Sequence, residues 1–419
     1  MEKALLANID NPRSREATFY ADNGGYESLK KALEMDPKDI IEMVKKAGLR
    51  GRGGAGFPTG MKWMFASGDP KFPKYLVCNA DEGEPGTFKD RPILEKNPHL
   101  LIEGMAISGH ALKAEYGYIY LRGEYPEAKD ILDAAIREAE EKGYIGENMM
   151  GSGKKFRLVV HQGAGAYICG EETALIESLE GKKGQPRIKP PFPVNVGAWA
   201  MPTIVNNVET LSNLPLLIRI GAEAYSKIGT PECPGPKLFC VSGHVKNPGV
   251  LELPMGTSLK EIIYEHCGGM RNGKQLKAVI PGGISTPVLP PDKIDCPMDF
   301  VNMPKHGSML GSGAVIVMDE SVCLVKVCYR AIKFFEHESC GKCTPCKEGV
   351  IWLRKILGRL EHGEGREGDV DLLAQVASNM AGRTFCPLGE GAASVVQNFV
   401  KHFRDEFAEH ISRKGCPLA

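Results

Sequence analysis

The sequence predicts an α/β domain, followed by a small β-grasp-like module and a helical C-terminal region. Helical periodicities alternate with short apolar runs from about residue 25 to 230, a hairpin opens the next stretch, and helical periodicity dominates from about residue 322. With 419 residues and 42% hydrophobic content, the chain is long enough for two or three domains. We expect these to span 1–230, 231–321 and 322–419.

The first domain shows both helical and strand patterns. Residues 75–78 and 157–160 are short runs of apolar, β-branched or aromatic residues that end at turn residues, which is typical of buried strands. A helical stripe precedes them, formed by Ile40, Ile41, Val44, Ala47 and Leu49. This alternation predicts helices packed on a sheet.

The next stretch changes in composition. Residues 231–237 read Pro-Glu-Cys-Pro-Gly-Pro-Lys, which is typical of a linker. Strand-like runs at 237–243 and 249–253 then flank a Lys-Asn-Pro-Gly turn, which predicts a hairpin. We expect Ser258 to begin a short helix that runs to Cys267, with further strands at 278–280 and 314–317. Hairpin, helix and strands in this order indicate a small β-grasp module.

Three cysteines in the C-terminal region repeat every third residue: Cys340, Cys343 and Cys346. Such a loop can wrap one corner of a [4Fe–4S] cluster while a fourth thiolate arrives from elsewhere in the fold. Cys386 is the candidate fourth ligand, and we expect Pro387 to end a ligand turn and prevent a helix from continuing there. Cys416, also followed by proline, competes with Cys386 for this role. Structural zinc is the alternative occupant, although zinc sites more often use two separate C-x₂-C pairs.

A glycine-rich segment over residues 51–63 is the densest chemical signal of the first domain. Gly51, Gly53 and Gly56 form a G-x-G-x-x-G match, but a helical stripe precedes it instead of the strand of a Rossmann fingerprint. Glycines allow backbone N–H groups to approach a phosphate or a planar ring, and Arg52 and Lys62 could neutralise a phosphate. A tight turn with solvated charges is the alternative interpretation.

Two polar segments follow predicted strands of this domain. Residues 79–87 come after the strand at 75–78, and residues 161–173 lie between the strand at 157–160 and a helix expected to begin near Thr173. Ligands of open α/β sheets usually bind where strands end. Carboxylates and an asparagine at that place suit ribityl and ribose hydroxyls and a carboxamide. The alternative is a solvated acidic loop.

The composition excludes several function classes. The chain has 52 basic and 52 acidic residues, so it shows no basic footprint for nucleic acid or anionic lipid. No secretory signal opens the sequence and no apolar run reaches the ~18 to 20 residues of a membrane span, so we expect any membrane link to come through a partner. Thirteen cysteines fit metal sites and buried thiols in a reducing cytoplasm better than a disulfide framework.

Six motifs, in the same order over nearly the whole chain, resemble the NADH-binding flavoprotein subunit of respiratory complex I. They are the glycine loop, Asn-Ala-Asp-Glu-x-Glu-Pro-Gly-Thr at 79–87, Gly-Ala-Gly-Ala-Tyr-Ile-Cys-Gly-Glu-Glu-Thr-Ala-Leu at 163–175, Lys-Pro-Pro-Phe-Pro at 189–193, Val-Asn-Asn-Val-Glu-Thr at 205–210, and the cysteine triplet. The resemblance implies a Rossmann-like FMN-binding α/β domain, a soluble-ligand-binding β-grasp domain and a C-terminal helical bundle with one [4Fe–4S] cluster.

The resemblance also implies site residues, carried over position by position. The FMN site would comprise Gly51, Arg52, Gly53, Gly54, Gly56, Lys62, Asn79, Asp81, Glu82, Tyr167, Gly170, Asn206 and Asn207. NADH would lie against Phe57, Phe65 and Phe192, with Glu84, Glu171, Glu172 and Lys189 holding its polar groups. Among these, we expect Glu84, Glu172 and Tyr167 to lie nearest the reaction. The cluster would be held by Cys340, Cys343, Cys346 and Cys386. For the phenylalanines, a place in the hydrophobic core is the alternative.

The implied reaction is redox chemistry: NADH passes a hydride to FMN, and electrons then leave singly through the cluster. The implied partners are a small thioredoxin-like iron–sulfur subunit and a larger multi-cluster subunit, in the peripheral arm of a membrane-bound complex on the cytoplasmic, inner face of the membrane. Three competing functions stay open. They are the diaphorase subunit of a soluble NAD-linked hydrogenase or formate dehydrogenase, a non-catalytic module with a zinc site, and a flavoenzyme acting on an organic substrate.

Overall fold

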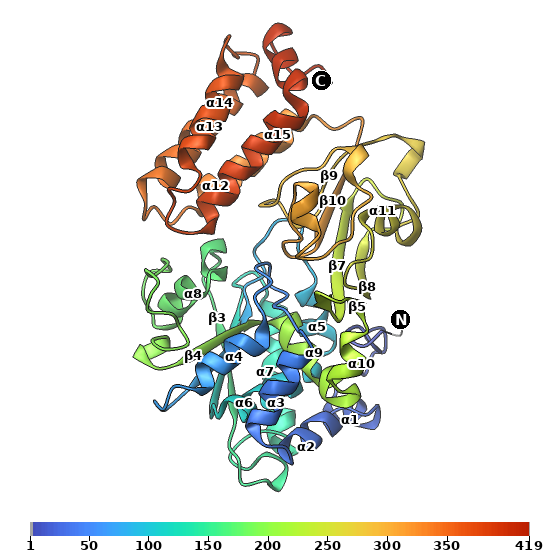
Figure 1. The fold of residues 1–419 in the computed structure, drawn as a ribbon, viewed down its shortest axis with the longest axis vertical. Coiled ribbons are helices and arrows are strands. Elements are labelled where there is room, and N and C mark those ends of the chain that lie inside the picture. The colour runs from blue at the N-terminus through green and yellow to red at the C-terminus, as the bar shows by residue number, and fades with distance from the viewer. Residues whose placement is uncertain (1–2, 419) are drawn as a thin grey trace. The chain divides into compact units, whose positions relative to one another are not determined.

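The computed structural model describes residues 3–418, which form two compact units. The first unit contains the chain up to Gly83, then Phe88–Phe239 and Val250–Gly256. The second contains Glu84–Thr87, Cys240–Gly249 and the described chain from Thr257 onward. Figure 1 shows the elements of both units along the chain.

A four-stranded parallel sheet organises the first unit. Its strands are β1 (Tyr75–Ala80), β2 (Tyr116–Leu121), β3 (Arg157–Gln162) and β4 (Thr203–Asn207), in the order β3-β2-β1-β4. The chain therefore proceeds outward from β1 to β3 and then returns to the other side of β1. This reversal makes the carboxyl ends of β1 and β4 a topological switch point, where open α/β sheets usually bind ligands.

Helices surround this sheet (Figure 1). They are α1 (Ala17–Asp22), α2 (Glu27–Leu33), α3 (Pro37–Lys46), α4 (Thr59–Ser67), α5 (Asp90–Lys96), α6 (Pro98–Leu112), α7 (Pro126–Glu141), α8 (Glu172–Leu179), α9 (Val208–Ile220) and α10 (Ala222–Ser226). Every residue of α6 is buried, because its apolar sequence packs against α9, α7 and the strands. Gly104 makes this possible, since a Cβ atom there would lie 2.2 Å from the carbonyl oxygen of Leu211 in α9.

A second four-stranded sheet has the order β8-β7-β10-β9. Its strands are β7 (Pro236–Gly243), β8 (Gly249–Pro254), β9 (Leu276–Ile280) and β10 (Ala314–Asp319); β10 runs parallel to β7 and antiparallel to β9. As predicted, Ser258 begins a helical segment, because its side chain accepts a hydrogen bond from the N–H of Lys260. That segment is α11 (Leu259–Glu261), which continues as a π-helical turn over Ile262–His266.

The C-terminal part of the second unit is a helical bundle (Figure 1). It consists of α12 (Leu324–Glu338), α13 (Thr344–Glu361), α14 (Asp369–Met380) and α15 (Pro387–Ser412). Apolar side chains at helical spacing, such as Leu324, Cys328, Ile332 and Phe335 of α12, are buried between the helices. The predicted fold class is thus confirmed, with a parallel α/β sheet, a β-grasp-type sheet and a helical bundle. The boundaries predicted for the three domains stay predictions.

Two sequence expectations differ from the structure. Residues 233–237 are buried and do not form an exposed linker, because β6 (Cys233–Pro234) pairs with β5 (Gly229–Thr230) and the carbonyl of Pro234 accepts a hydrogen bond from Arg52. Pro387 begins α15, although we expected it to prevent a helix from continuing there, since proline fits the first helical position, where no intrahelical N–H bond is needed. Among residues 3–418, no helix is long and apolar enough to cross a membrane.

Candidate functional site

The switch point of the first sheet brings two asparagines together. Asn79 and Asn207 are direct partners in the register of β1 and β4. The side-chain amide of Asn79 donates to the carbonyl of Gly170 (2.9 Å), and its Oδ1 accepts from the N–H of Asp81 (3.1 Å). Thus the predicted residues Asn79, Asp81 and Gly170 share one edge of the sheet with Asn207.

The glycine-rich loop lies against this edge. The N–H of Gly51 bonds to the carbonyl of Phe57 (2.9 Å), which closes the loop into a tight turn. Within it, Gly54 and Gly56 have backbone φ angles of 128° and 66°, values that residues other than glycine rarely adopt. A Cβ atom on Gly53 would lie 3.1 Å from Cβ of Asn207, so glycine allows the loop to approach the end of β4.

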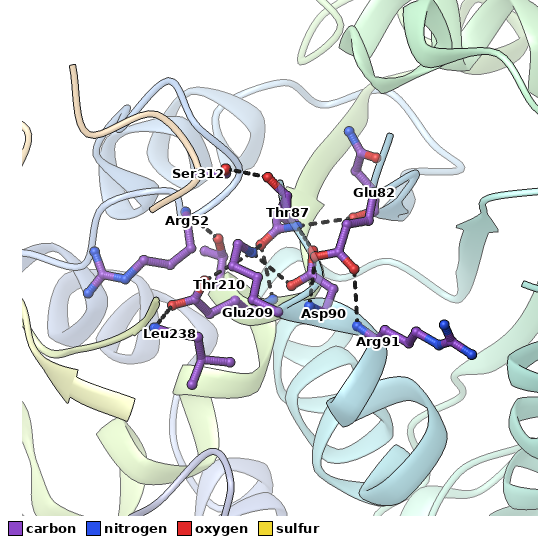
Figure 2. A network of polar contacts seen from close by, with 12 residues as sticks. Arg52, Glu82, Thr87, Asp90, Arg91, Glu209, Thr210, Leu238 and Ser312 are labelled. Atoms are coloured by element: carbon purple, nitrogen blue, oxygen red, sulfur yellow. Dashed lines mark hydrogen bonds and ion pairs between the residues drawn. The ribbon is translucent and has the colours of Figure 1, made fainter. Parts of the chain in front are cut away.

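Arg52 has an internal role in this loop. Its guanidinium is fully buried and donates to the carbonyls of Arg50 (3.3 Å) and Pro234 (2.7 Å). Its backbone N–H donates to Oγ1 of Thr210 at the start of α9 (2.8 Å), as Figure 2 shows. The side chain of Arg52 therefore stabilises the loop through buried hydrogen bonds to backbone carbonyls. We had expected it to contact a phosphate directly.

A buried ionic network lies beneath the same strand ends (Figure 2). The ammonium group of Lys89 contacts Asp90 (2.8 Å), Glu209 (2.9 Å) and Oδ1 of Asn207 (3.1 Å). Glu209 also pairs with Lys237 (2.8 Å), and all of these charged side chains are at most 3% exposed. The amide of Asn207 donates to Asp90 (2.7 Å), so the network fixes the orientation of Asn207.

Glu82 extends this network to the next helix. Its carboxylate accepts hydrogen bonds from the N–H groups of Asp90 (2.9 Å) and Arg91 (3.2 Å) at the start of α5. Burial, and after it the negative charge of Asp90, raises the pKa of Glu82 to about 7, although Lys89 partly opposes the shift. Glu82 is therefore a helix-capping residue whose charge depends on pH near neutrality.

A second ionic cluster joins α4, α8 and the 189–193 segment. Lys62 donates to Oε2 of Glu172 (2.8 Å) and to the carbonyl of Val205 in β4 (2.9 Å), whereas Lys189 contacts Glu171 and Glu172 (both 2.9 Å). Burial alone would raise the pKa of Glu172, but the ammonium groups of Lys62 and Lys189 outweigh it and hold the pKa at about 2. The cluster thus holds an ionised carboxylate on a lysine that is itself bonded to the middle of β4.

The two carboxylate oxygens of Glu171 make different contacts in this cluster. Its Oε2 accepts from the N–H groups of Thr173 and Ala174 (both 2.9 Å), so Glu171 caps α8, while its Oε1 contacts Lys189. The helix therefore begins at Glu172, close to the Thr173 predicted from the sequence.

The three predicted stacking phenylalanines are exposed. Phe57, Phe65 and Phe192 are 50%, 50% and 52% exposed, which excludes the alternative that they belong to the hydrophobic core. Phe65 lies one helical turn after Lys62 on α4, and Phe192 lies three residues after Lys189. Because Glu172 binds both lysines, the two phenylalanine segments are attached to the same ionic cluster.

Tyr167 and Asn206 are further predicted site residues of the first unit. A Cβ atom on Gly83 would lie 3.2 Å from Cδ2 of Tyr167, so glycine at position 83 allows close contact with the tyrosine. Asn206 is buried, and its Oδ1 accepts from the indole N–H of Trp63 in α4 (2.9 Å). This bond ties α4, which carries Lys62 and Phe65, to β4.

Glu84 belongs to the second unit, unlike the other predicted FMN and NADH residues. Its Oε1 accepts a hydrogen bond from the N–H of Ser285 (2.7 Å), and its Cγ would lie 2.5 Å from a Cβ atom on Gly283. The structure therefore gives Glu84 a defined contact with the loop after β9.

The four predicted cluster ligands gather in the helical bundle. Cys340 and Cys343 lie in the loop between α12 and α13, Cys346 lies in the first turn of α13, and Cys386 immediately precedes α15. Burial raises the pKa of Cys346 to about 11, and the neighbouring Cys343, Cys386 and Cys340 add to the shift although Ser339 opposes it. The N–H of Phe385 points at Sγ of Cys343 (3.5 Å). Cys386 thus joins the triplet, while Cys416 lies elsewhere, beside Cys323 and His410.

These residues fit the two implied cofactors. The glycine loop packs closely against Asn207 at the end of β4, and Gly83 packs closely against Tyr167. A loop with so few side chains suits a phosphate or a flat ring bound close to backbone N–H groups. Four thiols with a backbone N–H aimed at one sulfur suit an iron–sulfur cluster.

Comparisons with known proteins agree with this arrangement. The Nuo51 FMN-binding domain matches residues 44–216, the SLBB domain matches 237–317, and the NADH-ubiquinone oxidoreductase-F iron-sulfur binding region matches 326–410. An F-type subunit of the NADH-quinone oxidoreductase of Rhizobium meliloti is 54% identical over 418 residues, which are 100% of this chain and 99% of the relative. The chain belongs to the family of NADH-quinone oxidoreductase F-type subunits.

Other members of this F-type family are similarly close. The Escherichia coli member is 50% identical over 397 residues, covering 94% of this chain and 89% of the relative. A chain of the solved NAD⁺-reducing [NiFe]-hydrogenase is 37% identical with a TM-score of 0.84, covering 98% of this chain and 67% of that chain. The predicted resemblance is thus confirmed, and the chain contains an FMN-binding domain and an iron–sulfur binding region.

Sequence reasoning missed the residues that support the site of this F-type chain. Lys89, Asp90, Glu209 and Thr210 hold Asn207 and the glycine loop in place. Glu209 and Thr210 lie inside the motif at 205–210, and Lys89 and Asp90 closely follow the motif at 79–87. Polar residues within a strand-end motif, or closely after it, were therefore the available signal.

Proposed function

We propose that this chain is the electron-entry subunit of an NADH:quinone oxidoreductase, which takes a hydride from NADH and passes electrons on one at a time. The observation that carries the proposal is the meeting of Asn79, Asn207 and the Gly53 loop at the β1–β4 switch point, in a member of the F-type family. This geometry favours a flavin bound at the edge of the sheet in the first unit.

In this proposal, the glycine loop supplies backbone N–H groups to the flavin phosphate or ring, and Asn79, Asp81 and Asn207 hold its hydroxyl and carbonyl groups. Gly170 and Asn206 position neighbouring segments through their hydrogen bonds. Arg52 and Glu82 act through the loop and α5, because their side chains are buried and bound to backbone groups. When bound, the flavin accepts a hydride from NADH and releases electrons singly to an iron–sulfur cluster.

The exposed rings of Phe57, Phe65 and Phe192 provide surfaces on which the nucleotide bases of NADH can stack. Lys189, Glu171 and Glu172 offer charged groups for its ribose, carboxamide or phosphates. Of the residues expected nearest the reaction, Tyr167 and Glu172 lie in the first unit. Glu84 lies in the second unit, and its proposed role rests on the motif at 79–87. Their task is to hold two rings in reacting geometry, without acting as a nucleophile or base.

The cysteines at 340, 343, 346 and 386 would hold the [4Fe–4S] cluster as thiolates. Three of these cysteines lie before or in the first turn of α13, and the fourth lies directly before α15. Cluster binding would therefore hold the starts of these two helices together. The N–H of Phe385 would stabilise charge on Cys343.

We also propose the assembly. Electrons leaving the chain need an acceptor, for which a small thioredoxin-like iron–sulfur subunit and a large multi-cluster subunit are the proposed partners. In this assignment the protein belongs to the translocase class, in the peripheral arm on the cytoplasmic, inner face of a membrane. It reaches the membrane only through the complex.

One observation favours a second candidate. The TM-score of 0.84 with a chain of NAD⁺-reducing hydrogenase supports a diaphorase role in a soluble assembly. The two candidates differ in the proteins that copurify with the chain. Recovery of a hydrogenase partner would favour the diaphorase, and recovery of quinone-reducing partners would favour the main proposal.

An anaerobic visible absorption titration tests the electron-entry function. The purified protein, co-expressed with its small partner, is titrated with NADH and then with NADPH. Bleaching of both a flavin band and a broad iron–sulfur band by NADH supports the proposal. A colourless protein with zinc at the four cysteines would overturn it, and bleaching of flavin alone would contradict the cluster assignment.

A further inference from the structure

A second group of side chains of the types that ligate metals lies in the helical bundle. Cys323, His410 and Cys416 each direct a ligand atom into one place, and these three atoms all lie within 4.8 Å of one another. Sγ of Cys323 and Nε2 of His410 are 3.3 Å apart. Cys323 and His410 are buried and Cys416 is partly exposed, so an ion could enter from the side of Cys416.

This group is separate from the four cysteines described above. Cys323 immediately precedes α12, whereas Cys340 follows the end of that helix. The 15 residues of α12 separate these positions by roughly 22 Å at a rise of ~1.5 Å per residue. His410 similarly lies in the last turn of α15, while Cys386 precedes its first turn.

The histidine is held in the form that binds metals. Nδ1 of His410 is 2.8 Å from the backbone carbonyl of Glu406, to which it can only donate a hydrogen. The lone pair therefore resides on Nε2, which faces the two thiols. A carbonyl that fixes the tautomer from behind is the usual support of a metal-binding histidine.

A nearby carboxylate supplies an independent indication of a cation site. Among the described residues, Oε2 of Glu361 is buried and has no hydrogen-bond partner, while Oε1 is 3.8 Å from Lys326. Glu361 lies close enough to Cys323 to act on it electrostatically. A buried carboxylate oxygen without a partner is unfavourable beside neutral thiols, but favourable beside a divalent cation.

We propose that Cys323, His410 and Cys416 bind a zinc ion. Two thiolates and one imidazole form a soft N/S set that favours zinc, and a solvent molecule or Glu361 would complete a tetrahedron. Simple hydrogen bonding between Cys323 and His410 explains neither the convergence of Cys416 nor the buried oxygen of Glu361. Binding releases the thiol protons to solvent, and no electron transfer is involved.

The ion would fasten the end of the chain to the bundle. Its ligands come from the turn before α12, the end of α15 and the C-terminal tail, three segments of which the first lies far from the others in sequence. The tail already lies against the turn after α13, because a Cβ atom on Gly363 would lie 2.3 Å from the carbonyl oxygen of Lys414. A zinc ion would convert this packing contact into a fixed attachment.

Metal analysis of the full-length holoprotein tests the proposal. We expect about one zinc per chain after dialysis against a chelator, in addition to the iron of the cluster. Zinc X-ray absorption should show two sulfur neighbours at ~2.3 Å and one nitrogen at ~2.0 Å. Cys416→Ala should lose the zinc and retain iron and flavin, because Cys416 is partly exposed and its replacement leaves no large cavity. Cys267→Ala, at a buried cysteine outside the group, should keep the zinc.

Four results would overturn the proposal. The first two are a zinc content far below one per chain and a zinc content that Cys416→Ala leaves unchanged. The third is a native disulfide between Cys323 and Cys416 found by peptide mass. The fourth is a zinc ion surrounded by four sulfurs, since that pattern belongs to the other cysteines.

Discussion

Lys62 joins the carboxylate of Glu172 to the carbonyl of Val205, with its ammonium group 2.8 Å from the first and 2.9 Å from the second. A single side chain thereby connects α4, the start of α8 and the middle of β4. Because Glu172 also binds Lys189, removal of this one carboxylate should loosen the segments on both sides of the proposed nucleotide site.

We predict a pH-dependent effect of Glu172→Gln. A carboxyl whose pKa falls from its ordinary 4.5 to about 2 in the folded protein adds stability above pH 4.5 and loses it as the pH falls toward 2. After allowance for solvent screening, the contribution is on the order of 1–2 kcal/mol. The apparent Tm of the variant should therefore be lower at pH 7, and the difference should shrink below pH 4.5. Glu42→Gln, at an exposed glutamate of α3, is the control; equal Tm profiles for both variants would contradict the prediction.

Glu82 should produce the opposite pH trend. Its pKa is raised to about 7, so the stability it contributes is fully present below pH 4.5 and is lost as the pH rises through 7. Glu82→Gln should lower the Tm at acidic pH, because an amide keeps only one of the two oxygens that accept backbone N–H bonds. The deficit should narrow from pH 4.5 to 8, because the wild-type carboxyl then ionises in a buried position and the amide does not. Thermal melts across this range measure the trend, and a constant deficit would speak against it.

Gly83→Val should disturb the flavin site through Tyr167. Its new Cβ atom would lie 3.2 Å from Cδ2 and 3.3 Å from Cα of the tyrosine, so the ring must shift by a few tenths of an ångström or more. We expect a changed flavin midpoint potential or a several-fold lower NADH turnover, measured by redox titration and steady-state kinetics. Gly68→Ala has only ordinary contacts of 3.8 Å and serves as the control. An unchanged potential together with unchanged turnover would count against the idea.

Removal of the exposed rings should weaken NADH binding and leave stability intact. Stacking of a base on an aromatic ring contributes ~1–3 kcal/mol, so Phe65→Ala and Phe192→Ala should each raise the KM for NADH about ten-fold. The Tm should change little, since both rings are half exposed. Phe72→Ala, which removes a ring that is 57% exposed on the same unit, should leave the KM unchanged. A KM effect of the same size in all three variants would refute specific stacking.

Cys386→Ala should remove the cluster. The thiol is a neighbour of Cys346 and the proposed fourth ligand, so its loss should lower the iron content and abolish the electron paramagnetic resonance signal of the reduced cluster. Cys328→Ala, at a buried cysteine of α12, tests whether any cysteine change in the bundle has this effect. Full iron retention in Cys386→Ala would exclude it as a ligand.

The sequence by itself determined the succession of elements and the chemistry at strand ends. Short runs of apolar, β-branched or aromatic residues such as 75–78 form strands because their side chains fit a buried sheet, and these strands were predicted within two residues of their ends. The cysteine triplet and the glycine loop were likewise readable, because their chemistry depends on local spacing. Local spacing likewise predicts the helical segment that begins at Ser258.

The tertiary structure decided everything that depends on partners distant in sequence. It placed β4 beside β1 and thereby paired Asn207 with Asn79, and it buried the guanidinium of Arg52 against Pro234. It also separated the two competing cysteines, with Cys386 beside the triplet and Cys416 beside His410. No local pattern encodes these contacts, because they arise only when the burial of apolar faces fixes which segments meet.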